Sequence, residues 1–170
     1  MDFLTLAKER YSCRKFSDKP VEKEKIEKII EAGLAAPTAC NIQPYKIWVM
    51  ESEESQSKLR EVTNFTFGTN VALVVGCDSE IAWVRKYDGR NFADVDGSIV
   101  ATHLMLAVHE LGLGSTWIGF FDAPKLKELY PEMAKYDLVA IFPIGYPADD
   151  AVPAAGHTNK KDKAEMVKYL

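Results

Sequence analysis

The sequence has few of the residues that build metal sites or disulfide frameworks. Its three cysteines, Cys13, Cys40 and Cys77, are widely spaced, and neither a CxxC pair nor a nearby histidine accompanies them. A tetrahedral zinc site needs clustered ligands, and an odd number of isolated cysteines does not make a disulfide framework. The sequence therefore predicts neither a structural metal nor disulfide cross-links.

An excess of one charge and a long apolar run are also missing. The formal net charge is −4, and the basic residues are scattered apart from Lys160, Lys161 and Lys163. Nucleic-acid surfaces are usually basic, so that class of protein is disfavoured. The longest uncharged run, 62–77, contains several polar residues, and the N-terminus lacks the basic and apolar regions of a signal peptide. We expect a cytoplasmic protein that binds neither nucleic acid nor membrane.

What is present is typical of one globular domain. The chain has 170 residues, of which 47% are hydrophobic and 27% charged. Hydrophobic periodicity alternates between helical and strand-like segments, which predicts a layered α/β-type domain. The expected elements are a helix containing Ile26, Ile29 and Leu34 that ends near Pro37, strands at Ile47–Met50, Val71–Gly76, Thr116–Phe120 and Leu138–Ile144, helices at Glu53–Glu61 and Asp94–Leu111, and a short helix capped by Asp122. The polar segment after Pro147 is expected to be an extended tail.

The motif RYSCRKF, residues 10–16, has Arg10, Ser12 and Arg14 at alternate positions. Alternate side chains of an extended segment share one face, so two guanidinium groups and a hydroxyl would point the same way. Guanidinium groups match the geometry of phosphate oxygens, which favours a phosphorylated ligand. The alternative is a solvated basic strand with weak surface ion pairs.

The run APTACNIQPY, residues 36–45, contains uncharged hydrogen-bonding groups at Thr38, Asn41 and Gln43. These suit a planar heterocycle with several carbonyl groups and ring nitrogens, although an ordinary helix-to-strand connection uses similar residues. Cys40 as a nucleophile would need a base, and no local group is expected to lower its pKa. We therefore interpret Cys40 as a structural or ligand-lining residue.

A glycine-rich segment follows the long predicted helix in HELGLGSTWIGF, residues 109–120. Gly112 and Gly114 are typical helix-terminating residues, whereas Gly119 has no evident turn role and could allow close backbone approach to a ligand. The spacing is not GxGxxG after a strand, which disfavours a Rossmann dinucleotide site.

Taken in order, these stretches resemble the nitroreductase family of FMN-dependent NAD(P)H oxidoreductases. The likeness covers most of the chain, and its pieces are RYSCRKF, PVEKEKIEKIIEAGLAAPTACNIQPYKIWVM, DGSIVATHLMLAVHELGLGSTWIGF, IFPIGYP and KKDKAEMVKYL. The resemblance implies an α+β fold in which a mixed β-sheet lies between helical layers, a three-layer α/β/α arrangement. It also implies one FMN-binding domain over residues 1–170, with 148–170 as an extended tail, and a homodimer with two FMN sites at the subunit interface.

The resemblance also assigns cofactor contacts to particular residues. Arg10 and Ser12, with Tyr11 between them, look like contacts near the phosphate, and Arg14 looks like the cation near flavin N1 and the C2 carbonyl. Lys160 and Lys161 resemble a C-terminal phosphate clamp. The segment that the partner subunit would lay against the ring and ribityl chain comprises Pro37, Thr38, Ala39, Asn41 and Gln43. The residues that line the ring, with a backbone amide for N5, are Trp117, Ile118, Gly119 and Phe120. Either Asn64 or Asn70 is left as the ring-contacting asparagine.

The activity implied by the resemblance requires no protein nucleophile and no metal. NADH or NADPH would deliver hydride to flavin N5 and be replaced by a nitroaromatic, quinone or similar acceptor, which predicts ping-pong kinetics. The alternative is a flavin-binding sensor or storage protein without significant turnover. The sequence leaves open the choice between NADH and NADPH and the identity of the physiological acceptor.

Overall fold

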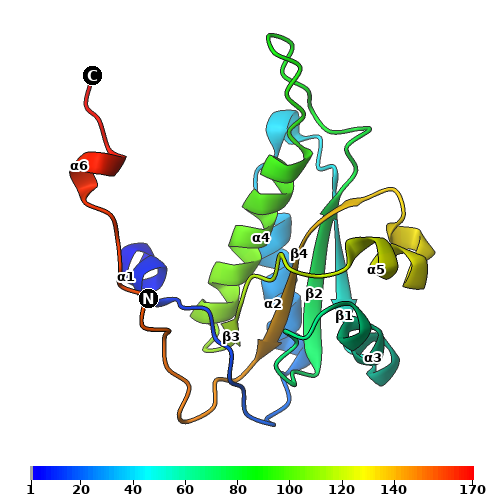
Figure 1. The fold of residues 1–170 in the computed structure, drawn as a ribbon, viewed down its shortest axis with the longest axis vertical. Coiled ribbons are helices and arrows are strands. Elements are labelled where there is room, and N and C mark those ends of the chain that lie inside the picture. The colour runs from blue at the N-terminus through cyan, green and yellow to red at the C-terminus, as the bar shows by residue number, and fades with distance from the viewer. Residues whose placement is uncertain (1) are drawn as a thin grey trace.

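The structure, a computed structural model, describes residues 2–170 (Figure 1). Helices and strands alternate along most of the chain, as the hydrophobic periodicity predicts. The α-helices are α1 (Phe3–Glu9), α2 (Lys23–Leu34), α3 (Glu53–Val62), α4 (Ala93–Glu110), α5 (Ala123–Leu129) and α6 (Lys163–Met166), with 3₁₀ turns η1 (Ala39–Asn41) and η2 (Pro131–Met133). The strands are β1 (Tyr45–Met50), β2 (Val71–Cys77), β3 (Gly114–Ser115) and β4 (Asp137–Gly145).

The four strands form one sheet in the order β1-β2-β4-β3, and every neighbouring pair is antiparallel. Tyr45 is opposite Cys77, and Val71 is opposite Ile144. The prediction of a mixed sheet is therefore wrong for these four strands. Among the described residues, parallel pairing occurs at an isolated bridge between Ser12 and Ser115. Strand direction depends on how the connecting segments pass over the sheet, and the hydrophobic pattern of a strand does not contain that information.

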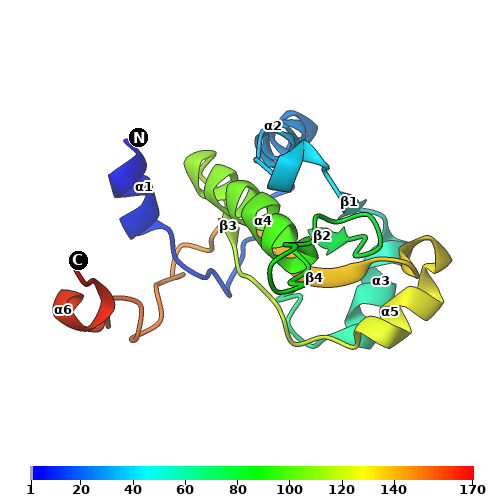
Figure 2. The same cartoon turned by 90° about the horizontal axis from the view of Figure 1, so that it is seen from above.

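The sheet is covered by helices on both faces, which confirms the predicted three layers (Figure 2). Leu73 and Val75 of β2 pack in the cluster that α2 and α4 cover, whereas Ala72 and Val74 pack with α3 and α5. Alternate side chains of a strand point to opposite faces, so a strand between two helical layers must be apolar throughout. This explains why all seven residues of β2 are buried.

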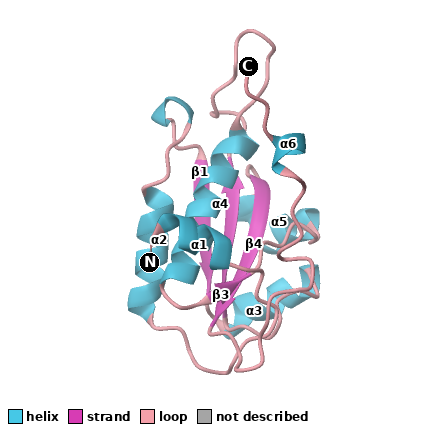
Figure 3. Ribbon diagram, turned by 90° about the vertical axis from the view of Figure 1, so that its left-hand side faces the viewer, coloured by secondary structure: helices cyan, strands magenta, loops and turns pink. Residues whose placement is uncertain are grey.

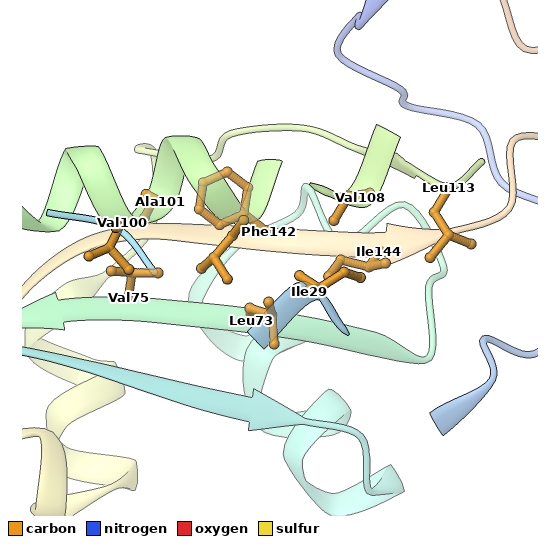
Figure 4. Packing of buried hydrophobic residues seen from close by; sticks show 12 residues of the cluster. Ile29, Leu73, Val75, Val100, Ala101, Val108, Leu113, Phe142 and Ile144 are labelled. Carbon is orange, nitrogen blue, oxygen red and sulfur yellow. The ribbon is translucent and has the colours of Figure 1, made fainter. Parts of the chain in front are cut away.

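The larger core cluster lies between β2, β4, α2 and α4 (Figure 4). Ile29 of α2, Val100 of α4 and Phe142 of β4 are each at most 1% exposed. Helix α2 crosses close to α4 at Gly33, where a Cβ atom would lie only 2.5 Å from a methyl carbon of Leu104. The prediction of a long, mostly buried central helix is confirmed, with bounds that differ by one residue at each end.

The short helix after Asp122 is also confirmed. The Asp122 carboxylate accepts the N–H of Lys125 at 3.0 Å, and Pro124 occupies the first turn of α5. The predicted strand at Thr116–Phe120 is largely wrong, because the pairing of β3 stops at Ser115 and resumes only at an Ile118–Ile141 bridge. The rest of that segment leaves the edge of the sheet.

Helices α1 and α6, near the two ends of the chain, lie on the same side of the sheet and its covering helices. Figures 1 and 2 show α1 and α6 on one side of the molecule, and Figure 3 is viewed from that side. Both helices carry exposed apolar side chains, including Phe3 at 70% and Met166 at 66% exposure. None of the helices described in residues 2–170 combines the length and apolar character needed to cross a bilayer.

Candidate functional site

The segment RYSCRKF is extended and attached to the edge of the sheet. The N–H of Cys13 donates to the carbonyl of Ser115 at 2.9 Å, and Phe16 forms an antiparallel bridge with Pro147. Cys13 is fully buried, whereas Arg14 is exposed. The predicted extended conformation is therefore confirmed, and it leaves the side chain of Arg14 free to reach a ligand.

Arg14 lies on a cleft of about 210 Å³ whose other walls are the segment after β3 and an aromatic turn. Its lining comprises Arg14, Phe65, Phe67, Thr116, Trp117, Ile118, Gly119 and Phe120. The Trp117 ring packs edge-on against Phe142, with centroids 5.1 Å apart, so the core fixes its orientation. Arg14 Nη1 makes a 3.2 Å bond to the Ser12 carbonyl and no ion pair within the described residues.

The backbone of this cleft also presents a donor. Ile118 exchanges two 3.0 Å hydrogen bonds with Ile141, which anchors the segment to β4. The next N–H, that of Gly119, has no hydrogen bond within residues 2–170, and Gly119 is exposed. A Cβ atom at Gly119 would have no neighbour within 4 Å. The cleft therefore combines a cation, aromatic walls and an available amide.

A second, smaller cleft of about 110 Å³ adjoins the start of the same segment. Arg10, Tyr11 and His109 line it together with Ser115 and Pro147. Burial, and then the positive charge of Arg10, lowers the pKa of His109 below its ordinary value. Both effects favour the neutral form of the imidazole, and Arg10 is the cation that lines this cleft.

The 37–43 loop has a defined shape that its own hydrogen bonds maintain. The N–H of Gln43 donates to Thr38 Oγ1 at 3.0 Å, and Gln43 Nε2 donates to Asn41 Oδ1 at the same distance. Cys40, Asn41 and Gln43 all have positive φ angles between 51° and 54°. Pro37, Asn41 and Gln43 are exposed, whereas Thr38 and Ala39 are half-buried.

One chain does not bring the 37–43 loop to Arg14. The loop is hydrogen-bonded to the first turn of α4 through Ala39 and Asp96, whereas Ser115 and Arg10 lie beyond the other end of that helix. Helix α4 has 18 residues, which corresponds to about 27 Å at the usual rise. Figure 1 shows the two regions at opposite ends of α4. The sequence-predicted contacts are thus divided into two groups.

The predicted phosphate clamp lies in the C-terminal tail. Lys160 and Lys161 are exposed immediately before α6, and neither forms an ion pair within residues 2–170. The tail approaches the RYSCRKF segment at His157, whose ring contacts that of Tyr11 with centroids 6.4 Å apart. The structure therefore brings the tail toward Tyr11 without bringing either lysine into the clefts.

The sequence profile of the nitroreductase family matches residues 7–67 and 60–146, which together make up most of the chain. This chain belongs to the nitroreductase family.

Two nitroreductase-family relatives are similar over almost their whole length. A protein of Methanothermobacter thermautotrophicus, provisionally named an NADH dehydrogenase/NAD(P)H nitroreductase, is 32% identical over 157 residues, which cover 88% of this chain and 80% of the relative. The crystal structure of a nitroreductase family protein from Clostridium difficile is 34% identical, has a TM-score of 0.91 and covers 99% of this chain and 98% of that one.

A structure provisionally described as a nitroreductase from Desulfovibrio desulfuricans, solved in complex with FMN, has a TM-score of 0.81 at 24% identity. The match covers 98% of this chain and 95% of that one. At this identity, the likeness supports the fold alone.

Two aromatic residues that line the Arg14 cleft, Phe65 and Phe67, were not predicted. Phe65 lies 6.0 Å from Phe67 and 6.1 Å from Phe120, measured between ring centroids. The sequence signal for these residues is the alternation of aromatic side chains in NFTFG, a stretch that contains no charged residue. Asn64 lines an adjoining cleft of about 400 Å³ with Phe65 and Phe120.

We expect Gly114→Ala to loosen the RYSCRKF segment. A Cβ atom at Gly114 would lie 2.7 Å from Cys13 Cβ and 2.8 Å from its sulfur. Both atoms are close to the backbone, so the segment must move, and overpacking of this kind costs about 1–3 kcal/mol. Urea unfolding measures the loss, and Gly119→Ala, which has open space for its methyl group, should change stability by less than about 0.5 kcal/mol. Equal stability of the two variants would contradict the packing argument.

Proposed function

We propose that this protein is an FMN-dependent NAD(P)H oxidoreductase of the nitroreductase type, which reduces nitroaromatic, quinone or similar acceptors with ping-pong kinetics. The observation that carries the proposal is the cleft in which Arg14, Trp117 and the N–H of Gly119 come together. FMN, when bound, supplies a two-electron carrier that takes hydride from NAD(P)H and passes it to the acceptor.

The residues of the Arg14 cleft fit a flavin ring. The Arg14 guanidinium, which lacks a carboxylate partner within the described residues, would stabilise negative charge on the ring. Phe65, Phe67 and Trp117 give flat apolar surface against which a ring system can lie. The exposed amide of Gly119 is available to a ring nitrogen, and the FMN complex of the D. desulfuricans structure belongs to the same fold.

A phosphate group fits the other end of the segment. Arg10 is the cation of the smaller cleft, and Ser12 lies next to it on the extended backbone. The C-terminal end of a helix carries partial negative charge, which would oppose a phosphate. Here Lys25 Nζ donates to the carbonyl of Leu111 at the end of α4, at 2.7 Å, and offsets part of that charge. In this proposal Lys160 and Lys161 complete the phosphate contacts when the tail folds over.

The proposed unit is a homodimer in which each site uses both chains. Within one chain, the 37–43 loop and Arg14 are separated by about the length of helix α4. A second copy of the chain is therefore needed to bring this loop to the Arg14 cleft. The outward face of α4 is hollowed by a cleft of about 520 Å³, lined in part by Val95, Ile99 and Thr102. An apolar helix with an uncovered face suits burial against a second copy. Residues 1–170 then act as one FMN-binding domain with 148–170 as its tail.

The proposed chemistry leaves Cys40 without a catalytic role. The thiol is exposed, and no hydrogen bond to it is present within residues 2–170. The contribution of the chain is to bind and orient the reactants and to place positive charge near the ring.

A visible spectrum recorded before and after addition of reductant tests the function. We expect purified protein supplied with FMN to show bound-flavin absorbance, NADH or NADPH to bleach it without oxygen, and menadione or a nitroarene to restore it. Protein that stays colourless and does not bind added FMN would refute the proposal. Bound flavin that neither reductant bleaches would favour the sensor or storage alternative.

A further inference from the structure

Asp96 is a buried carboxylate in the first turn of α4. Its side chain belongs to a residue that is only 1% exposed, and its Oδ1 accepts the backbone N–H of Ala39 at 2.9 Å. Its other oxygen, Oδ2, is also buried and has no hydrogen-bond partner within the part of the chain that the structure describes. A core selected for stability alone rarely keeps such a group, because burying an incompletely paired carboxylate is unfavourable.

Among residues 2–170, no cationic side chain makes a hydrogen bond to the Asp96 carboxylate. Burial, and then the negative charges of Asp96 and Asp94, raises the pKa of the nearby Cys77 thiol to about 12. A neighbouring cation would have the opposite effect on a thiol. Asp96 lies in the first turn of α4, and the amide of Ala39 is the hydrogen-bond donor that reaches its carboxylate.

The 37–43 loop, whose Ala39 amide binds Asp96, has a backbone conformation that contacts outside the loop must stabilise. Cys40, Asn41 and Gln43 have left-handed backbone angles, which for non-glycine residues cost about 1–3 kcal/mol each in unfavourable cases and persist only when the surroundings impose them. The other hydrogen bonds of the 37–43 loop join its own residues. Among residues 2–170, the bond from Ala39 to Asp96 is the one that ties this loop to the body of the protein.

We infer that Asp96 is a positioning residue, which holds the 37–43 loop in the conformation that contacts the cofactor of the partner subunit and lowers the stability of the protein in doing so. The inference rests on the proposed function, because it assumes that the loop contacts FMN. It predicts opposite effects of one substitution on cofactor binding and on stability, which a purely structural role would not produce.

The test compares Asp96→Leu, Asp96→Asn and the control Glu128→Gln in the full-length protein. Leucine has as many side-chain heavy atoms as aspartate but cannot accept a hydrogen bond from the Ala39 amide. FMN affinity should therefore fall about ten-fold, which corresponds to the free energy of about one hydrogen bond. The urea midpoint of the FMN-free protein should stay the same or rise, because a buried oxygen without a hydrogen-bond partner has been removed. Hydrogen exchange of residues 38–43 should become faster in the same variant.

The other two variants separate charge from geometry. Asparagine retains an oxygen acceptor for the Ala39 amide, so Asp96→Asn should keep FMN affinity within about three-fold of wild type. Glu128→Gln replaces an exposed carboxylate of α5 by an amide, away from the α4 cleft proposed for the subunit interface, and should change neither affinity nor loop exchange. The inference is overturned if Asp96→Leu binds FMN as wild type does, or if it loses stability in proportion to its loss of affinity. Wild-type protein that fails to bind FMN overturns the proposed function itself.

Discussion

Arg14→Ala is expected to weaken FMN binding by about 10- to 100-fold, which corresponds to the loss of one hydrogen-bonded charge worth about 1.5–3 kcal/mol. Arg14 is exposed and makes one long bond to the backbone of Ser12, so the fold should be retained. A cation near the ring stabilises the reduced, negatively charged form, so the midpoint potential of the bound flavin should also fall. Fluorescence titration of FMN and a spectroelectrochemical titration measure the two effects.

Two further variants make the Arg14 result specific. Arg14→Lys keeps the charge but loses the planar pair of donors, so its affinity should lie between those of wild type and Arg14→Ala. Arg85→Ala removes a guanidinium that pairs with Asp88, with Nε at 2.8 Å from Oδ1, and that does not line the Arg14 cleft. Arg85→Ala should bind FMN normally. Unchanged affinity and potential in Arg14→Ala would refute the role assigned to Arg14.

Phe142→Ala should cause the largest loss of stability, about 3–5 kcal/mol, because it leaves a cavity in a core that is otherwise close-packed. Phe142 lies on β4, is 1% exposed and packs between the sheet and α4 (Figure 4). The same ring supports Trp117 edge-on, so the remaining folded protein should also bind FMN more weakly. Urea unfolding gives the stability, and FMN titration below the transition gives the affinity.

The effect of Phe142 should depend on burial rather than on aromatic character. Tyr87→Ala also removes a ring, but Tyr87 is 87% exposed, so its unfolding free energy should change by less than about 0.5 kcal/mol. Phe142→Leu fills part of the space and should fall between the two. Similar losses for Phe142→Ala and Tyr87→Ala would contradict the assignment of the core.

Elements with strong local signals were predictable from the sequence. The apolar stripe of α2 buries Ile26 and Ile29, and Asp122 with Pro124 begins α5, as local helix chemistry requires. The Thr116–Phe120 segment shows the limit of this reasoning. Its composition suits a strand, but only Ile118 pairs with β4, because a β-prone segment at a sheet edge pairs only where it lies beside its neighbour.

The candidate site was predictable in its parts. The structure brings Arg14, Trp117 and Gly119 to one cleft, and their roles toward FMN stay predictions. The roles assigned to Arg10, Tyr11, Ser12, Lys160 and Lys161 stay predictions, as do those of the 37–43 loop. Phe65 and Asp96 were not found. The aromatic alternation around Phe65 is too short to distinguish a ligand wall from a packed turn, and a lone aspartate of a helix has no local pattern that marks it as a contact to a loop.

The sequence by itself determined helices α2 to α5, the buried strand β2 and the membership of the family, because these depend on local periodicity, capping residues and ordered motifs. Helices α1 and α6 were not predicted, and α6 lies in the segment expected to be an extended tail. Only the tertiary structure decided that the strands run antiparallel, that Asp96 holds Ala39, and that APTACNIQPY and RYSCRKF lie at opposite ends of α4. The physical reason is that residues far apart in the chain make these contacts. Their partners are fixed by packing, which no short stretch of sequence contains.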